Sequence, residues 1–147
     1  MKKLGGIVLL VVLCFSLVGC GNDKEEPLTE IEQYAVDCIN EYKSKIANPD
    51  ELKVHDIRWQ NESQIREAGF LEDTLHIYID KSFQNESGGY TRNIGLCRQY
   101  GDIFDYYADY SEKSTQSNDK QLYNNWLKIK KEDNAKISVD RVMKNVD

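Results

Sequence analysis

The chain has 147 residues, with 25 Asp and Glu against 19 Lys and Arg and a net charge of −6 at pH 7. This length suits one domain with a modest core and is short for two. Binding to a nucleic-acid backbone requires clustered Lys and Arg, so the acidic balance argues against a nucleic-acid partner.

A basic start and an apolar run open the sequence. Lys2 and Lys3 precede Leu4 to Val18, about 15 mostly apolar residues, whereas a bilayer core takes roughly 20 to span. A run of this length between lysines and small residues is typical of a secretory signal peptide. An uncleaved anchor helix is the alternative.

The run ends on Leu17-Val18-Gly19-Cys20, which resembles the lipobox of bacterial lipoproteins. The resemblance implies that Cys20 carries a diacylglyceryl group with palmitate-like acyl chains and that a peptidase cleaves before it. The mature protein would then stay anchored to the cell membrane on its extracytoplasmic face, because two acyl chains exceed the marginal anchoring of one. An ordinary signal peptide with a chance cysteine is the alternative.

This interpretation predicts three regions. Residues 1–19 are a removed signal peptide, residues 20–27 are the lipidated N-terminus and a linker, and residues 28–147 form a single domain. Removing Lys2 and Lys3 leaves 17 basic and 25 acidic residues, a net charge of about −8. An acidic body is not expected to lie flat on anionic lipid, so we expect the lipid to tether a body that stands off the membrane.

The domain is predicted to begin with an amphipathic helix. Thr29 and Glu32 have the spacing of a capping box, and Asn48-Pro49-Asp50 is predicted to end the helix. Apolar residues recur on one helical face at Ile31, Ala35, Cys38, Tyr42 and Ile46.

Extended segments follow the helix. Alternation and turn residues predict strands over 52–59, 74–83, 90–100 and 103–110, with a hairpin turn at 85–89. The polar residues 60–73 are predicted as a loop with one turn of helix. Gly95, inside the third strand, indicates a bulge or a close backbone approach. The segment 103–110 also fits a helix, but its aromatic content favours a strand.

Two short helices complete the chain. Leu122, Trp126 and Ile129 have helical spacing, and Ser138 precedes a second short apolar repeat from Val139. The predicted fold class is α+β, with an N-terminal amphipathic helix packed on a three- to four-stranded antiparallel sheet and short C-terminal helices.

The segments NPDELKVHDI (48–57) and IYIDKSFQNESGGYTR (77–92) resemble uncharacterised small exported lipoproteins of Gram-positive bacteria. Glu51 stands where those proteins usually have serine. The resemblance implies an exported helix-plus-sheet domain, and it brings no catalytic residues.

Cys38 and Cys97 remain once Cys14 leaves with the signal and Cys20 is lipidated. A disulfide is chemically allowed outside the cytoplasm. By closing a loop of about 60 residues it would contribute on the order of 4 kcal/mol. If Ile94 and Leu96 face the core, however, Cys97 faces away unless Gly95 shifts the phase. Two buried unpaired cysteines are the alternative.

Catalytic signatures are missing from the sequence: it contains no His-Glu-x-x-His, Cys-x-x-Cys, phosphate-binding glycine loop or Gly-x-Ser-x-Gly. His55 and His76 could meet across the sheet as a metal site with Asp56 or Asp80, but two solvent-facing strand histidines are favoured. Asp102, Asp105 and Asp109 are interpreted as a solvated acidic face in preference to a cation site. No metal, cofactor or catalytic residue is therefore predicted.

Tyrosine usage suggests a binding surface. Nine tyrosines could present an aromatic patch for a glycan or an envelope protein, with Tyr78, Tyr90, Tyr106 and Tyr107 as candidates. Half-buried strand positions are the favoured alternative.

The sequence predicts a membrane-tethered extracytoplasmic lipoprotein that acts as a non-enzymatic binding or accessory module at the cell envelope. Two alternatives stay open: an inhibitor or immunity-type protein that blocks a partner, and a hydrolytic enzyme, which would need a deep pocket that joins His55 or His76 to carboxylates.

Overall fold

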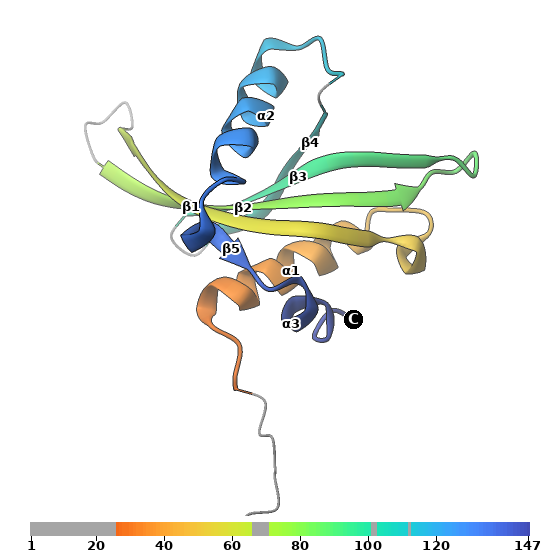
Figure 1. Cartoon of the computed structure of the whole chain (residues 1–147), viewed down its shortest axis with the longest axis horizontal. Helices are drawn as coiled ribbons and strands as arrows, with labels where there is room; N and C mark the ends of the chain where they lie inside the picture. The colour runs from red at the N-terminus through yellow and green to blue at the C-terminus, as the bar shows by residue number, and fades with distance from the viewer. Residues whose placement is uncertain (1–25, 66–70, 101–102, 112) are drawn as a thin grey trace, which may run out of the picture.

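The computed structural model describes residues 26–65, 71–100, 103–111 and 113–147, with backbone only at 62–65, 71–73, 100 and 103–108. Figure 1 shows a sheet with helices on both of its sides. In chain order the elements are α1 (Glu30–Lys43), η1 (Pro49–Glu51), β1 (Lys53–Ile65), β2 (Leu71–Gln84), β3 (Tyr90–Tyr100), β4 (Ile103–Tyr110), α2 (Ser117–Ile129), η2 (Asp133–Ala135), β5 (Lys136–Ile137) and α3 (Val139–Met143).

The strands form one antiparallel sheet in the order β4-β3-β2-β1-β5. This confirms the α+β class, but the expected three to four strands are fewer than the five described. The sequence pattern misses β5 because Lys136 and Ile137 are too short a run to show alternation. The helix predicted as N-terminal begins only at Glu30.

A capping box starts α1, as predicted. The Thr29 Oγ1 accepts a hydrogen bond from the Glu32 amide at 3.2 Å, and the Glu32 carboxylate accepts one from the Thr29 amide at 2.8 Å. The helix ends at Lys43, before the predicted stop at Asn48. Ile46 still packs against the core from the following turn, and so its spacing imitates another helical turn.

The strands β1 and β2 extend further toward each other than the predicted strands 52–59 and 74–83. The expected loop at 60–73 is largely strand, because β1 continues to Ile65 and β2 begins at Leu71, directly opposite it. Backbone hydrogen bonds between strands need no apolar alternation, which explains why this polar sequence can extend the ladder. The predicted turn at 85–89 is present, and Gly88 adopts a φ of +83° there.

Both faces of the sheet are buried. On β2, Ile77 and Ile79 point toward α1, whereas Tyr78 belongs to a second cluster with Trp126 of α2. Figure 1 shows α1 and α3 on one side of the sheet and α2 on the other. The face of β2 that alternation assigns to solvent is thus a second core.

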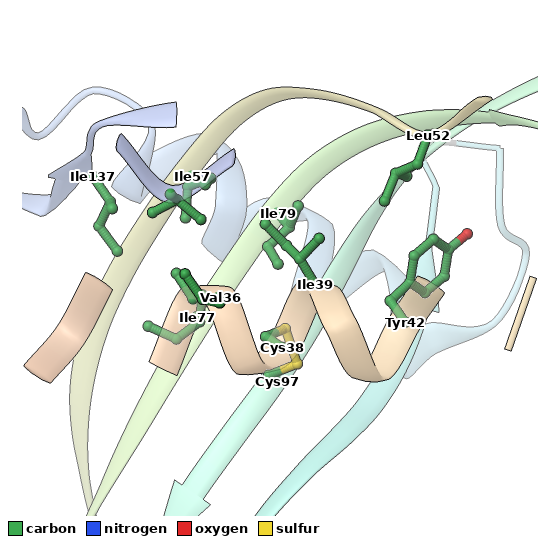
Figure 2. Close-up of a cluster of buried hydrophobic side chains, with 12 residues drawn as sticks. Val36, Cys38, Ile39, Tyr42, Leu52, Ile57, Ile77, Ile79, Cys97 and Ile137 are labelled. Carbon is green, nitrogen blue, oxygen red and sulfur yellow. A yellow bond between two sulfur atoms is a disulfide. The ribbon is translucent and has the colours of Figure 1, made fainter. Parts of the chain in front are cut away.

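The core on the α1 side is the larger one (Figure 2). Its buried members are Ala35, Val36, Cys38, Ile39, Tyr42, Leu52, Ile57, Ile77, Ile79, Cys97, Ile137 and Val142. The core on the α2 side contains Tyr78, Ile94, Leu96, Tyr110, Trp126, Ile129 and Ala135.

Candidate functional site

The described chain begins close to α3, at the end of the predicted linker. Arg141 of α3 donates from Nη2 to the carbonyl oxygens of Glu26 (3.4 Å) and Pro27 (3.2 Å). The same nitrogen lies 3.1 Å from Oε2 of Glu32, and Nε lies 2.9 Å from Oε1. Arg141 therefore fixes the last linker residues to both α1 and α3. The predicted lipidation residue, Cys20, lies outside the described residues.

Glu32 is the acidic centre of this contact. Burial alone would raise the pKa of its carboxyl, but hydrogen bonds from Thr29 and Arg141 outweigh burial and lower the pKa below its ordinary value. The carboxylate thus stays charged and holds the capping box and the linker together at neutral pH.

Two surface grooves lie beside α3 and beside the end of α1. One, of about 310 Å³, is lined by Glu26, Pro27, Leu28, Arg141, Lys144 and Asn145. The other is lined by Asn40, Lys43, Ser44, Pro49, Asp50 and Asp147. Neither groove contains a histidine, a cysteine or a tyrosine.

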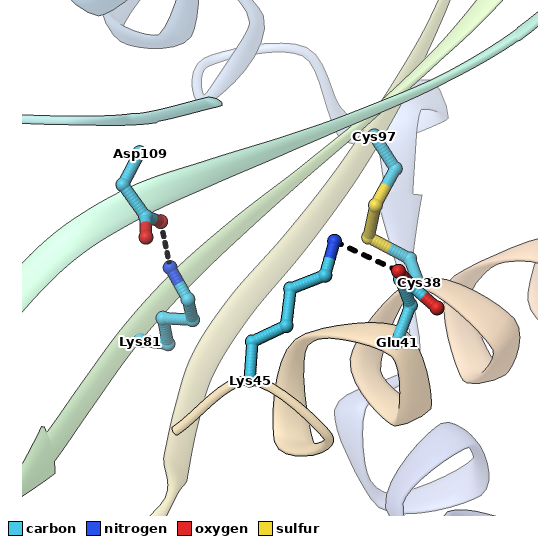
Figure 3. Close-up of a disulfide and its surroundings, with 6 residues drawn as sticks. All are labelled: Cys38, Glu41, Lys45, Lys81, Cys97 and Asp109. Atoms are coloured by element: carbon cyan, nitrogen blue, oxygen red, sulfur yellow. Dashed lines mark hydrogen bonds and ion pairs between the residues drawn. A yellow bond between two sulfur atoms is a disulfide. The ribbon is translucent and has the colours of Figure 1, made fainter. Parts of the chain in front are cut away.

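The candidate disulfide is present in the structure. Cys38 of α1 and Cys97 of β3 are bonded, with a Cα–Cα distance of 6.0 Å, and both residues are fully buried (Figures 2 and 3). The expected conflict of phase does not arise, because Ile94 and Leu96 face the α2 core while Cys97 faces α1. The bulge lies at Leu96/Cys97 in the pairing with β4 and not at Gly95.

The proposed tyrosine surface does not form as predicted. Tyr78 is fully buried between the sheet and Trp126, so it cannot contribute to an exposed patch. Tyr90 is 60% exposed; its hydroxyl donates to Glu51 at 3.0 Å and Lys53 lies over its ring. The side chains of Tyr106 and Tyr107 lie outside the described residues.

The two histidines lie apart in the register. His55 is exposed at a bulge in β1, with Nε2 2.8 Å from the Ser82 hydroxyl. His76 is opposite Gln60 and is buried beside Tyr78, which corrects the expectation that it faces solvent. Alternation places His76 correctly on the second face, but it cannot show that this face is covered.

Two ion pairs lie on the α2 side of the sheet, one within β1 and one between β2 and β3. Asp56 and Asp80 lie opposite each other on β1 and β2. Arg58 contacts both oxygens of Asp56 at 3.1 Å, and Arg92 contacts Asp80 at 2.8 and 2.9 Å. The hydrogen bonds and charge of Asp80 raise the pKa of Arg92. The half-buried Asp56 and the buried Asp80 thus each have a guanidinium partner.

A buried lysine lies on the α1 side. Lys81 of β2 is only 1% exposed, and its Nζ contacts Asp109 of β4 (Figure 3). The same nitrogen donates to Oδ1 of Asn93 on β3 at 2.8 Å. The Tyr42 ring lies 4.0 Å from the same nitrogen. Burial lowers the pKa of Lys81 although the charge and hydrogen bond of Asp109 oppose this effect.

This polar group was not predicted from the sequence. We call it the Lys81 site, and its members are Tyr42, Lys81, Asn93 and Asp109. The sequence contained one indication of a buried lysine. On a strand, Lys81 points to the same face as Ile77 and Ile79, which were expected to face the core. Asp109 belonged to the expected solvated acidic face, and in the structure it pairs with Lys81. Asp102 and the side chain of Asp105 lie outside the described residues.

Comparison with protein-family models, with curated proteins and with solved structures finds no match for this chain. Among the described residues no helix is long and apolar enough to cross a membrane. The same residues include no group of three or more His, Cys, Asp or Glu side chains that could hold a metal ion.

Proposed function

We propose that this protein is a bacterial lipoprotein, anchored through Cys20 to the extracytoplasmic face of the cell membrane, where its α+β domain acts as a binding or accessory module. The observation that carries this proposal is the sequence Leu17-Val18-Gly19-Cys20 after a basic, apolar leader of signal-peptide length. Two acyl chains on one cysteine are sufficient for a stable anchor.

The disulfide supports export. Cys38 and Cys97 are bonded inside the main core, and such bonds persist in oxidising compartments outside the cytoplasm. The bond joins α1, the helix next to the linker, to the central part of the sheet. The disulfide therefore links the helix that follows the proposed tether covalently to the sheet.

The Arg141 contact supports a tether of defined length. Cys20 and Glu26 are separated by six residue steps, which span at most about 22 Å when extended, so the domain would stand off the bilayer by no more than about this distance. Glu26 is fixed on the α1 and α3 side, whereas α2 lies on the other side of the sheet (Figure 1). We therefore assign α2 and the adjacent strand ends as the region available to a partner.

A binding role is favoured over hydrolysis by the arrangement of the polar groups. An enzyme built on His55 or His76 would bring one of them together with carboxylates in a deep pocket. His55 instead contacts Ser82 on the surface, and His76 is packed beside Tyr78. Asp56 and Asp80 are each occupied by an arginine.

Metabolic labelling with a fatty acid tests the anchor. The full chain is produced in a bacterial host, and label is followed in the wild type, in Cys20→Ser and in Cys14→Ser as the matched control. We expect label and membrane association in the wild type and the control, and loss of both in Cys20→Ser. Label that survives Cys20→Ser would contradict the proposal.

A further inference from the structure

In the Lys81 site an amine, that of Lys81, contacts both a side-chain amide and a carboxylate. Lys81 and Asn93 are directly opposite each other on β2 and β3, and Asp109 lies on the next strand, β4, opposite Gly95. Asn93, Gly95 and Cys97 share one face of β3 by strand parity. Because Gly95 has no side chain, the Lys81 side chain can extend toward Asp109 past this position.

Burying a lysine among apolar neighbours costs desolvation free energy, so the position of Lys81 calls for an explanation. Lys81 belongs to the face of β2 that carries Ile77 and Ile79, and the side chain is buried under Tyr42 of α1. Replacing such an ion pair by apolar residues is often neutral or stabilising, so the pair by itself gives little reason for the lysine. Burial also favours the neutral amine, the form that can act as a nucleophile.

We propose that the Lys81 site forms an intramolecular isopeptide bond between Nζ of Lys81 and Cγ of Asn93, with Asp109 as the proton acceptor. The Nζ–Oδ1 distance of 2.8 Å places the amine beside the amide carbonyl, and Cγ is bonded to that oxygen. Reacting groups held in contact by a folded sheet lose little further entropy on reaction.

The reaction balances without a further reagent. Asp109 takes one proton from the Lys81 ammonium, and the neutral amine attacks Cγ of Asn93 to form the new C–N bond. The second amine proton moves to Nδ2, the Cγ–Nδ2 bond breaks, and ammonia leaves. Ammonia then takes the proton from Asp109 and departs as ammonium, which regenerates the carboxylate. No atom is oxidised or reduced, and the inference does not depend on the lipid anchor.

Peptide mass analysis of the full chain, purified from cells, reduced, alkylated and digested with trypsin, tests the bond. Because trypsin cannot cleave at an acylated lysine, we expect residues 67–92 joined to residues 93–98 in a branched peptide. Its mass should be lower by one ammonia than the sum of the two peptides, and fragment ions should place the branch at Lys81. A linear peptide that begins at Ser82, or loss of water with a join to Asp109, would overturn the proposal.

Three variants separate the roles. Lys81→Arg keeps the positive charge, but its guanidinium is not a nucleophile, and Asp109→Asn keeps the shape without a proton acceptor. Both should release the peptide that begins at Ser82. Lys45→Arg is the matched control, because Lys45 is exposed and pairs with Glu41 (Figure 3), and it should keep the branched peptide. The wild-type mass is decisive even if a variant fails to fold, and a branched peptide in Asp109→Asn would contradict the role of Asp109.

Discussion

Arg141 of α3 and Glu32 of α1 form a two-point ion pair, with Nε 2.9 Å from Oε1 and Nη2 3.1 Å from Oε2. The pair joins three parts of the chain, since Glu32 also receives the Thr29 amide and Arg141 also holds the Glu26 and Pro27 carbonyls. The contact thus links the predicted tether to two helices.

Removing the guanidinium should loosen this end of the domain. Arg141→Ala is expected to lower the free energy of unfolding by about 1 kcal/mol, because the arginine is partly exposed and water screens the pair. Denaturant unfolding measures the change. The exposed Lys131→Ala is the control and should stay within about 0.5 kcal/mol of the wild type.

The stabilisation that this contact provides should depend on pH. The pKa of Glu32 in the folded state lies below its ordinary value of 4.5, so the unfolded chain binds the proton more tightly. The stabilisation is complete above the ordinary pKa and is lost as the pH falls through the folded-state pKa. Unfolding measured against pH should show the advantage of the wild type over Glu32→Gln shrinking in acid. An advantage that grows in acid would contradict this sign.

The disulfide should be detectable without reductant. Alkylation of the unreduced, denatured protein followed by digestion should leave the peptides of Cys38 and Cys97 joined. Replacing both by alanine should lower the free energy of unfolding by about 2–5 kcal/mol, because the unfolded chain gains entropy. Alkylated Cys38 and Cys97 in the unreduced sample would show that the bond is not formed.

The second core can be tested at α2. Trp126 is 2% exposed and packs near Tyr78, whereas the adjacent Leu127 is 41% exposed. Trp126→Ala should cost about 3–5 kcal/mol by removing a large buried side chain. Leu127→Ala should change stability by no more than about 0.5 kcal/mol. Equal effects would mean that α2 does not cover a core.

Tyr110 allows a test of the cost of burying a hydroxyl group. Its hydroxyl is buried, has no hydrogen-bond partner within the described part of the chain, and burial raises its pKa strongly. Tyr110→Phe should therefore be neutral or stabilising, by up to about 1 kcal/mol. The exposed Tyr90→Phe is the comparison and should leave the unfolding midpoint unchanged. A clear loss of stability in Tyr110→Phe would reveal a partner for the hydroxyl.

Local signals in the sequence predicted much of the fold. The Thr29 and Glu32 spacing located the start of α1, and turn residues at 85–89 placed β3 at its observed bounds. These features depend on residues near in sequence, where capping and turn chemistry act. The ladder beyond Trp59 and the short β5 depend on pairing with distant strands, which alternation does not encode.

The side-chain environments were harder to predict. Tyr78 and His76 have the parity of a solvent face, but α2, about 40 residues later in the chain, packs on that face. The position of Cys97 was ambiguous for the same reason, because one core was assumed where the sheet has two. The Lys81 site joins three strands and a helix, so no single segment of sequence contains its pattern.

Lipidation at Cys20 is tested most directly by the mass of the N-terminal peptide of the protein extracted from membranes in detergent. If the protein is a lipoprotein, this peptide begins at Cys20 and carries a diacylglyceryl group on its sulfur. An N-terminus upstream of Cys20, or an unmodified Cys20 thiol in the membrane-extracted protein, would contradict it.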